Sequence, residues 1–394
     1  MTEGGAYTAA PTPRDPGRPA FLELFFDLVY VVVMISLVGT LAADVSWTGV
    51  GETLVLLLAF TLVWAVTTWA ADTLDLTRPA VQVQFIGVAA GSLLLAAAAS
   101  DAYDGRGLLF AITYLAIHLG SSIYYLLLRP DANEPVRSGR ILFWYTIASV
   151  GWIGGALATG PTRLLLWAAT VVLEYVAASL GWPLPKRGRS QPQEWRLVGE
   201  RVAERYRQFV IIALGASIFI IGTTFTVSDY TMGRAWALLV VFTTVVLAWR
   251  IYIYRAGELL TEAIARSANP SLLTQSAAVT HLIMVAGIGG TAVTSHLVVL
   301  RPFGETPPSW TAVILGGPAL FLVGRAVLDY TVFGRISRSR LAGLVLLAGA
   351  APAAGLLPPV VVALLAMSIL ALVAAANLVS THRHARAPMP PALG

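Results

Sequence analysis

Cysteine is absent from this chain of 394 residues, and charged residues make up only 12% of it. The lack of cysteine excludes disulfides, thiolate metal sites, iron–sulfur clusters bound through cysteine and a cysteine nucleophile. Soluble domains carry about 25% charged residues, so this chain has too little charge to cover a globular surface in water. A hydrophobic share of 57% and a mean hydropathy of +0.75 indicate a lipid bilayer as the solvent.

Several motifs of soluble enzymes are also missing. The sequence has no glycine-rich phosphate loop ending in Lys and Ser or Thr, no His-Glu-x-x-His zinc pair and no pair of Asp-rich prenyl-diphosphate segments. Its net charge of +5 is spread between apolar blocks instead of forming a continuous patch, so nucleic acid is not an expected partner. We also expect no cofactor and no metal ion.

Long apolar blocks without strand-like alternation predict an all-α integral membrane protein. A bilayer core of about 30 Å requires about 20 apolar residues in a helix. By that measure the chain has about twelve transmembrane helices, at 24–43, 50–71, 81–99, 106–127, 139–159, 162–182, 206–226, 232–254, 274–299, 309–330, 339–357 and 359–381. Residues 1–20 lack the basic-then-apolar order of a signal peptide and are interpreted as a disordered cytoplasmic tail. Residues 382–394 form the second predicted tail.

The distribution of Lys and Arg predicts the orientation of the chain. The positive-inside rule places these residues in short cytoplasmic loops. Under twelve spans, one set of loops and both tails carry most of them, while each loop of the opposite set carries one at most. We therefore predict a multi-pass protein of the cell membrane with both termini in the cytoplasm.

The longest polar connection divides the chain into two candidate six-helix halves. They cover residues 21–183 and 206–381 and are joined by a cytoplasmic linker at 184–205. From about Gln193 the linker has the apolar spacing of an amphipathic surface helix, for which a regulatory or gating role is the alternative to simple lipid contact.

A weak internal match supports this division. The segment from Glu23 to Tyr30 aligns with the segment from Glu204 to Ile211, and the match continues from Ser36 to Ser217. Six spans per half predict two parallel repeats, related by an axis along the membrane normal. Membrane proteins often build central pathways at the interface between such repeats.

Ionisable side chains inside spans are costly in lipid and are therefore functional candidates. Glu23 and Asp27 are four residues apart and share one helix face at the cytoplasmic mouth of the first span. Acidic residues in a first helical turn also favour the helix dipole, which is a purely structural explanation. An unbroken apolar run follows Asp27, so we expect this carboxylate to be buried. Its partner would be Arg129, Arg205 or Arg325.

A polar stripe surrounds His118, in the middle of the fourth predicted span. Tyr114, Ser121, Ser122 and Tyr125 fall at helical spacings around this histidine. The stripe favours a polar cavity or a proton relay. The alternative is a histidine that is simply satisfied within the core.

Two other spans carry isolated ionisable residues. Arg325 and Asp329 are four residues apart and can pair with each other. Glu174 stands alone in the sixth predicted span. Unless it faces a cavity or carries a proton, it requires a hydrogen-bond donor such as Tyr124 or Tyr145.

A histidine also begins a run rich in small residues. Gly287, Gly289 and Gly290 follow His281 within three turns and permit either close helix packing or a broken helix. Close packing is the favoured interpretation.

Three segments resemble the marker segments of the bacterial low temperature requirement A (LtrA) family. They are Glu23-Leu-Phe-Phe-Asp27-Leu-Val-Tyr-Val, Glu204-Arg-Tyr followed by Ile-Ile-Ala-Leu-Gly-Ala-Ser217, and His281-Leu-Ile-Met-Val-Ala-Gly. The resemblance covers essentially the whole chain in the right order and implies a membrane protein of a family named for a growth phenotype. That family usually has Leu-Gly-Glu-Ser in the seventh span, where this chain has Ala216 before Ser217. If the family's Glu couples transport to an ion or proton, this chain lacks it there.

Three functions agree with the sequence. The leading hypothesis is transport or permeation of an ion or small solute along a polar path between the halves. Asp27, His118 and His281 would line that path, with Glu23 and Arg205 at its cytoplasmic mouth. The remaining candidate pathway residues are Tyr114, Glu174, Ser217 and Arg325.

The second hypothesis is a membrane-embedded enzyme, such as a cyclase or transferase, acting on a lipophilic or isoprenoid substrate. Acidic and aromatic side chains around one cavity would protonate an alkene and stabilise cations. The candidates are Trp64, Tyr114, Tyr124, Trp144, Tyr145 and Glu174. The third hypothesis is a non-catalytic, stress-related membrane protein. The lipid bilayer is the expected partner under all three hypotheses. The sequence leaves undecided whether the chain forms a homo-oligomer.

Overall fold

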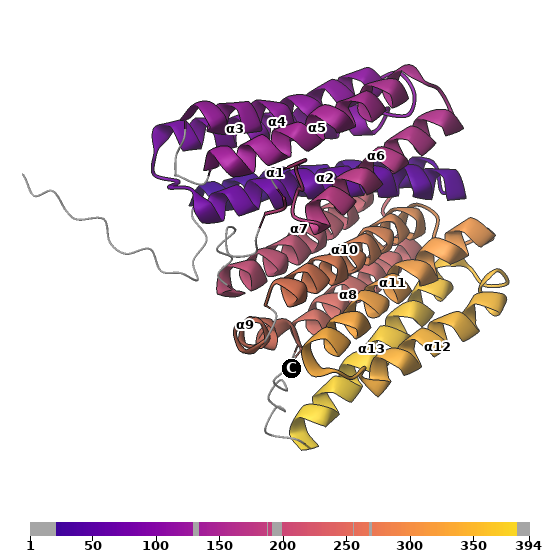
Figure 1. Cartoon of the computed structure of the whole chain (residues 1–394). Helices are drawn as coiled ribbons and strands as arrows, with labels where there is room; N and C mark the ends of the chain where they lie inside the picture. Colours follow the sequence, from indigo (N-terminus) through magenta and orange to yellow (C-terminus); the bar gives the residue numbers. More distant parts are fainter. Residues whose placement is uncertain are drawn as a thin grey trace, which may run out of the picture.

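The computed structural model describes residues 21–128, 134–186, 188–190, 199–254, 256–267 and 270–383. The first half of these residues forms six helices: α1 (Phe21–Ala43), α2 (Trp47–Thr73), α3 (Pro79–Ala99), α4 (Gly107–Leu128), α5 (Glu134–Leu157) and α6 (Pro161–Ser179). The second half forms seven: α7 (Gly199–Thr226), α8 (Met232–Ile253), α9 (Ala256–Arg266), α10 (Pro270–Leu300), α11 (Pro308–Phe333), α12 (Arg338–Ala354) and α13 (Pro359–Arg383). The axes of the long helices are roughly aligned with one another, and α9 lies across one end of the bundle (Figure 1).

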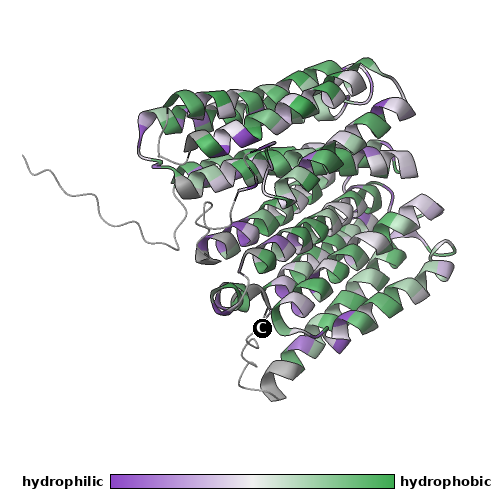
Figure 2. Ribbon diagram, viewed as in Figure 1, coloured by the Kyte–Doolittle hydropathy of each residue, from purple (hydrophilic) through white to green (hydrophobic). Residues whose placement is uncertain are grey.

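Ten of the thirteen described helices are long and apolar enough to cross a bilayer. Of the helices found at the twelve predicted spans, the exceptions are α5, which carries Arg137 and Arg140 near its start, and α12, which has only 17 residues. At about 1.5 Å per residue, α12 is shorter than a bilayer core of about 30 Å. Hydrophobic residues run along the helices, and hydrophilic ones gather mostly near helix ends (Figure 2). The structure confirms an all-α polytopic membrane protein, with twelve spans as an approximate count.

Two segments differ from the sequence prediction. The helix α7 begins at Gly199, so the last residues of the predicted linker are the first turns of a long helix. Residues 191–198 of that linker lie outside the described residues, as do 1–20, 384–394 and Arg129. The short helix α9 was not predicted, because its sequence is too polar for a span. Its buried residues, Leu260, Ala263 and Ile264, nevertheless have helical spacing.

Local signals explain where several helices begin. The Ser46 hydroxyl oxygen accepts the backbone N–H of Gly49 at 3.1 Å at the start of α2. Thr231 accepts the backbone N–H of Arg234 at 3.3 Å at the start of α8. Both are N-caps, which satisfy an otherwise unpaired donor of the first turn. The helices α3, α6 and α11 begin with proline, which loses no helical hydrogen bond at that position.

The two halves share the same order of helix neighbours. In the first half, α1 packs on α2 and α3, α3 on α4, α4 on α5, and α5 on α6. In the second half, α7 packs on α8 and α10, α10 on α11, α11 on α12, and α12 on α13. The halves meet mainly where α1 packs on α7 and α10. This interface brings the starts of α1 and α7, whose sequences match, next to each other.

Glycines allow α10 and α11 to approach closely. A Cβ atom on Gly287 would overlap the backbone of Gly317 and Phe321, and one on Gly317 would overlap the backbone of Gly290. The helix α10 continues without a break from Pro270 to Leu300. Close packing, the favoured interpretation of the glycine-rich run after His281, is therefore what the structure shows.

Candidate functional site

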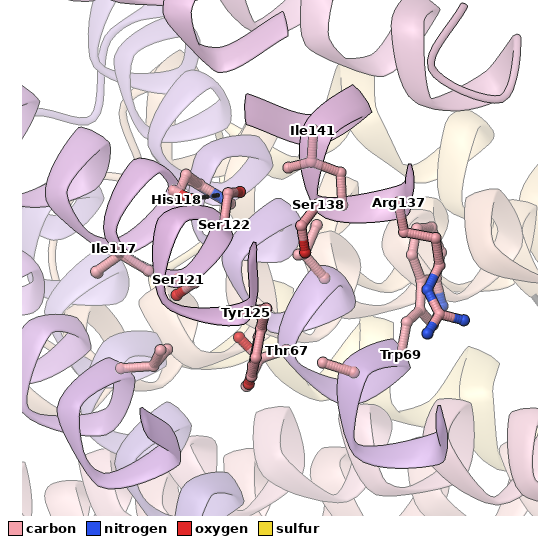
Figure 3. A pocket seen from close by; sticks show the side chains of 13 residues that line it. Thr67, Trp69, Ile117, His118, Ser121, Ser122, Tyr125, Arg137, Ser138 and Ile141 are labelled. Atoms are coloured by element: carbon pink, nitrogen blue, oxygen red, sulfur yellow. Dashed lines mark hydrogen bonds between the residues drawn. The ribbon is translucent and has the colours of Figure 1, made fainter. Parts of the chain in front are cut away.

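A pocket opens within the first half, between α2, α3, α4 and α5 (Figure 3). Its empty volume is about 610 Å³, which includes space open to the surroundings. The polar residues that line it are Thr67 from α2, His118, Ser121, Ser122 and Tyr125 from α4, and Arg137 and Ser138 from α5. Four of the five residues of the predicted stripe on α4 thus share one pocket, because helical spacing places them on one face. In the close-up, His118 and Arg137 lie at opposite sides of the pocket.

His118 is buried at the wall of this pocket, with 2% of its surface exposed. Its ring stacks on Tyr145 of α5 with centroids 3.8 Å apart and planes 9° apart. The ring of Tyr114, one turn earlier in α4, meets His118 edge-on at 4.6 Å. The Nε2 atom of His118 is buried without a hydrogen-bond partner among the described residues. A buried polar atom without a partner is costly and marks a position where a ligand or proton can be received.

Glu174 of α6 contacts Tyr114, the residue whose ring meets His118. Its Oε2 atom accepts the Tyr114 hydroxyl at 2.8 Å, and its Oε1 atom accepts the Trp152 Nε1–H at 2.8 Å. The side chain is 1% exposed, and no ion pair reaches it from the described residues. We call Tyr114, His118, Tyr145, Trp152 and Glu174 the Glu174 cluster. It connects α4, α5 and α6 around a carboxyl group that has only neutral donors.

Glu23 and Arg205 pair across the interface of the two halves. Sequence reasoning had placed both residues at the cytoplasmic mouth of the path without predicting this pair. The two side chains form a buried ion pair between α1 and α7. Arg205 also donates to the side-chain oxygen of Gln208 at 3.1 Å. An ion pair at this position ties α1 to α7 directly.

Asp27 lies one turn further along α1 and accepts the Trp64 Nε1–H at 3.3 Å. The ring of Trp64 in turn stacks on Phe209 of α7, with centroids 4.5 Å apart. A tryptophan of α2 therefore donates to Asp27, and Arg205, one of the arginines expected as its partner, acts on the carboxylate electrostatically. The second carboxylate oxygen of Asp27 has no hydrogen-bond partner among the described residues.

In the second half, both ring nitrogens of His281 have partners. Its Nδ1 lies 2.7 Å from the Ala277 carbonyl oxygen, and its Nε2 lies 3.1 Å from the Tyr252 hydroxyl. A carbonyl oxygen only accepts, so Nδ1 carries the proton and Tyr252 donates to Nε2. Tyr206 stacks on the ring at 5.0 Å. Both ring nitrogens of His281 are thus hydrogen-bonded, and in the neutral ring Tyr252 is the donor to Nε2.

Arg325 pairs with Asp329 within α11, as their spacing predicted, at 2.6 Å. Arg325 is fully buried and also donates to the carbonyl oxygens of Ile251 and Tyr254 at the end of α8. The other Asp329 oxygen lies 3.1 Å from the guanidinium of Arg340 in α12. This network places one carboxylate between two buried guanidinium groups and joins α8, α11 and α12.

Ser217 is buried, and its hydroxyl donates to the Ala213 carbonyl of its own helix at 2.9 Å. Ala216 beside it is also buried. The aligned residue of the first half, Ser36, instead donates to Ala96 of α3 at 2.6 Å. The two serines that match in sequence therefore make different contacts.

The expected path residues fall into separate groups. Neither Asp27 nor His281 lines the pocket that holds His118. Of the candidate enzyme residues, Tyr114, Tyr145 and Glu174 come together. The suggested donor Tyr124 instead bonds the Ala80 carbonyl at 2.8 Å.

Sequence reasoning missed Trp152, the second donor to Glu174. Trp152 follows Tyr145 by seven residues, so both lie on one face of α5, and this spacing was the available signal. Among the described residues, no group of three or more His, Asp or Glu side chains is placed to hold a metal ion.

Comparison with known proteins places this fold in a family. The profile described as bacterial low temperature requirement A protein (LtrA) matches residues 18–375. The chain is similar to an uncharacterised protein of Rhizobium meliloti (strain 1021), with 33% identity over 327 residues, which cover 82% of this chain and 80% of that protein. No solved structure matches the chain. The marker segments near Glu23, Glu204 and His281 lie within a match that covers most of the chain. The chain therefore belongs to the bacterial LtrA family.

Proposed function

We propose that this protein moves a small polar solute or ion across the cell membrane and that the first-half pocket binds it. The observation that carries the proposal is the pocket itself, which presents His118, Arg137 and several hydroxyl groups between apolar helices. Polar groups are expensive within a bilayer unless they face one another, water or a ligand. Polar groups that line a pocket between apolar helices therefore favour a ligand with hydrogen-bonding groups.

The lining of the pocket offers hydrogen-bonding groups to a polar solute. It contains the basic side chain of Arg137 and the imidazole of His118, and no carboxylate is among the described residues that line it. Two hydroxyls donate to their own helices, Thr67 to Val63 at 2.7 Å and Ser122 to the His118 carbonyl at 2.8 Å. Their oxygens can still accept a hydrogen bond, so the pocket can serve a ligand with both donors and acceptors.

The proposed transport cycle uses the interface between the halves. We infer that the halves are parallel repeats, that both termini are cytoplasmic as the loop charges indicate, and that the path closes at the α1–α7 interface. The support is the Glu23–Arg205 ion pair and the stacking of Trp64 on Phe209. The ion pair must loosen if α1 separates from α7, and the stacking must loosen if α2 separates from α7.

A proteoliposome experiment tests the transport function. Osmotic light scattering measures entry of acetate, glycine and glycerol, and a potassium-sensitive dye measures entry of K⁺. We expect entry of at least one solute above protein-free vesicles, with a loss of entry in His118→Gln. The matched control is His296→Gln, because His296 contacts Thr224 near the far end of α10, outside the pocket. Equal entry in protein-free and protein-containing vesicles for every solute would contradict the proposal.

A membrane-embedded enzyme is the second candidate, favoured by the aromatic surroundings of Glu174. The rings of Tyr114 and Trp152 lie 4.5 Å apart and both donate to this carboxyl group. An acid among aromatic rings suits protonation of an alkene and stabilisation of the resulting cation. Comparing the lipid and isoprenoid extracts of a deletion strain with those of a Glu174→Gln strain tests it. Profiles that match the wild type in both strains would remove this candidate.

A further inference from the structure

We propose that Glu174 is a proton-binding site and that its proton resides on Oε2, the carboxyl oxygen that faces Tyr114. The role we give this proton, coupling to solute movement, rests on the transport function proposed above. The proton site itself follows from the contacts of Glu174 alone.

The surroundings of Glu174 select a proton over larger cations. Both of its oxygens already accept hydrogen bonds from neutral donors, and the side chain is 1% exposed. Glu174 does not line the neighbouring pocket. An isolated charge in such a place costs several kcal/mol. A proton removes the charge without needing a cavity.

The titratable neighbours of Glu174 offer no compensating positive charge. They are Tyr114 and His118 of α4, Tyr145 of α5 and Tyr175 of α6. Tyr175 donates to the Leu58 carbonyl of α2 at 3.1 Å. His118 is separated from the carboxyl group by the Tyr114 ring.

The two hydrogen-bond donors decide which oxygen is protonated. The indole N–H of Trp152 can only donate, so the oxygen facing it, Oε1, must stay an acceptor. The hydroxyl of Tyr114 can donate or accept, so it tolerates an O–H group on Oε2. Protonation forms one O–H bond at Oε2 and changes the charge of the carboxyl group from −1 to 0. The Tyr114 hydroxyl then accepts from Oε2, and its own hydrogen turns away.

This reversal of one hydrogen bond links the carboxyl group to the pocket. The ring of Tyr114 contacts His118, which lines the pocket and has an unpartnered Nε2. Tyr114 therefore meets the pocket wall through its ring and Glu174 through its hydroxyl. Loading Glu174 thus changes the hydrogen bonding directly behind the wall of the proposed solute site.

Infrared difference spectroscopy of the full-length protein in liposomes tests the proton site, with the bulk pH as the only variable. We expect a carboxylic-acid C=O band that appears and disappears with pH and is lost in Glu174→Gln. The amide is a matched replacement, because its NH₂ donates to Tyr114 and its C=O accepts from Trp152, which reproduces the protonated acid. The control is Glu52→Gln, a partly exposed carboxyl of α2, which should leave this band in place.

A second variant keeps the proposal falsifiable if the amide variant folds poorly. Tyr114→Phe removes the partner of Oε2 and should shift the frequency of the same band without abolishing it. The absence of any acid band in the wild type, a band that survives in Glu174→Gln, or a band that Tyr114→Phe leaves unmoved would each overturn the proposal.

The outcome is separable from that of the transport experiment. If the band behaves as expected and no solute enters the vesicles, the proton site stands and the transport function fails. If solutes enter the vesicles and the band is absent, transport stands and the proton site fails.

Discussion

The two halves of the molecule share an order of helix neighbours and differ in how they treat buried polar groups. In the second half, Asp329 lies between Arg325 and Arg340, and both nitrogens of His281 are bonded. In the first half, Glu174 has neutral donors only, and His118 keeps a ring nitrogen without a partner. Among the described residues, the second half thus gives these buried groups charged or hydrogen-bonding partners, whereas the first leaves a carboxyl group without a cation and an imidazole nitrogen without a partner.

Packing shows the same contrast. In the second half, glycines bring α10 and α11 into backbone contact, and the pocket there is lined by Thr244, Thr291 and Thr294. All three hydroxyls donate to carbonyls of their own helices. In the first half, the pocket is larger and contains a histidine and an arginine. The difference suggests that one half acts as a scaffold and the other provides the site.

The largest effect is expected from breaking the charge network of the second half. Asp329→Ala leaves Arg325 and Arg340 buried without their shared carboxylate, and loss of one partner of a buried ion pair costs about 3–5 kcal/mol. Unfolding in detergent micelles measures this loss. The control is Asp229→Ala, because Asp229 pairs with Arg234 while 94% exposed, and its loss should change stability by less than about 0.5 kcal/mol. Similar losses in both variants would show that burial of the Asp329 network gives it no special weight in the stability of the second half.

A smaller loss is expected at the α10–α11 contact. Gly287→Ala places a methyl group against the backbone of α11, and overpacking of this kind costs about 1–3 kcal/mol. Gly289→Ala is the matched control, because a Cβ there meets nothing within 4 Å. Alanine at position 289 should be neutral or stabilising, since alanine is the better helix former. Thermal unfolding of the two variants, measured side by side, decides the matter. A midpoint for Gly287→Ala equal to that of the wild type would show that the contact is loose.

The smallest stability effect is expected in the first half. Glu174→Gln keeps both hydrogen bonds and should change the free energy of unfolding by less than about 1 kcal/mol. Glu174→Leu, by contrast, leaves the Tyr114 hydroxyl and the Trp152 N–H without an acceptor and should cost about 1–3 kcal/mol for each group. The same unfolding assay compares the two variants. If glutamine destabilised the protein as much as leucine does, the charge of Glu174 would be structurally required and the proton site would be wrong.

Much of the architecture could be predicted from the sequence, because bilayer thickness and apolar length are directly related. The Arg325–Asp329 pair could be predicted from a spacing of four residues within one helix. Arg205 was expected at the acidic start of the first span as one possible partner of Asp27, and it forms its ion pair with Glu23 four residues earlier. The Arg325–Asp329 prediction depends on a distance along one helix, which a sequence contains.

The contacts of the candidate site depend on how each helix is rotated about its axis, which apolar sequence hardly records. The prediction that Tyr124 donates to Glu174 is therefore wrong, because Tyr124 bonds the Ala80 carbonyl. The actual donor Trp152 was overlooked. The three residues expected on one path, Asp27, His118 and His281, lie in separate groups for the same reason. The helix α9 was not predicted because it is short and its apolar residues occupy only one face of an otherwise polar segment.

The most direct measurement compares solute entry into proteoliposomes that contain His118→Phe or Thr294→Val. Phenylalanine can keep the stacking on Tyr145 but removes the ring nitrogens from the first-half pocket. Valine keeps the shape of Thr294 in the pocket of the second half and removes its hydroxyl. If the first half provides the solute site, entry falls to the protein-free level in His118→Phe and stays at the wild-type rate in Thr294→Val. Wild-type entry in His118→Phe, or an equal loss in both variants, would contradict this account.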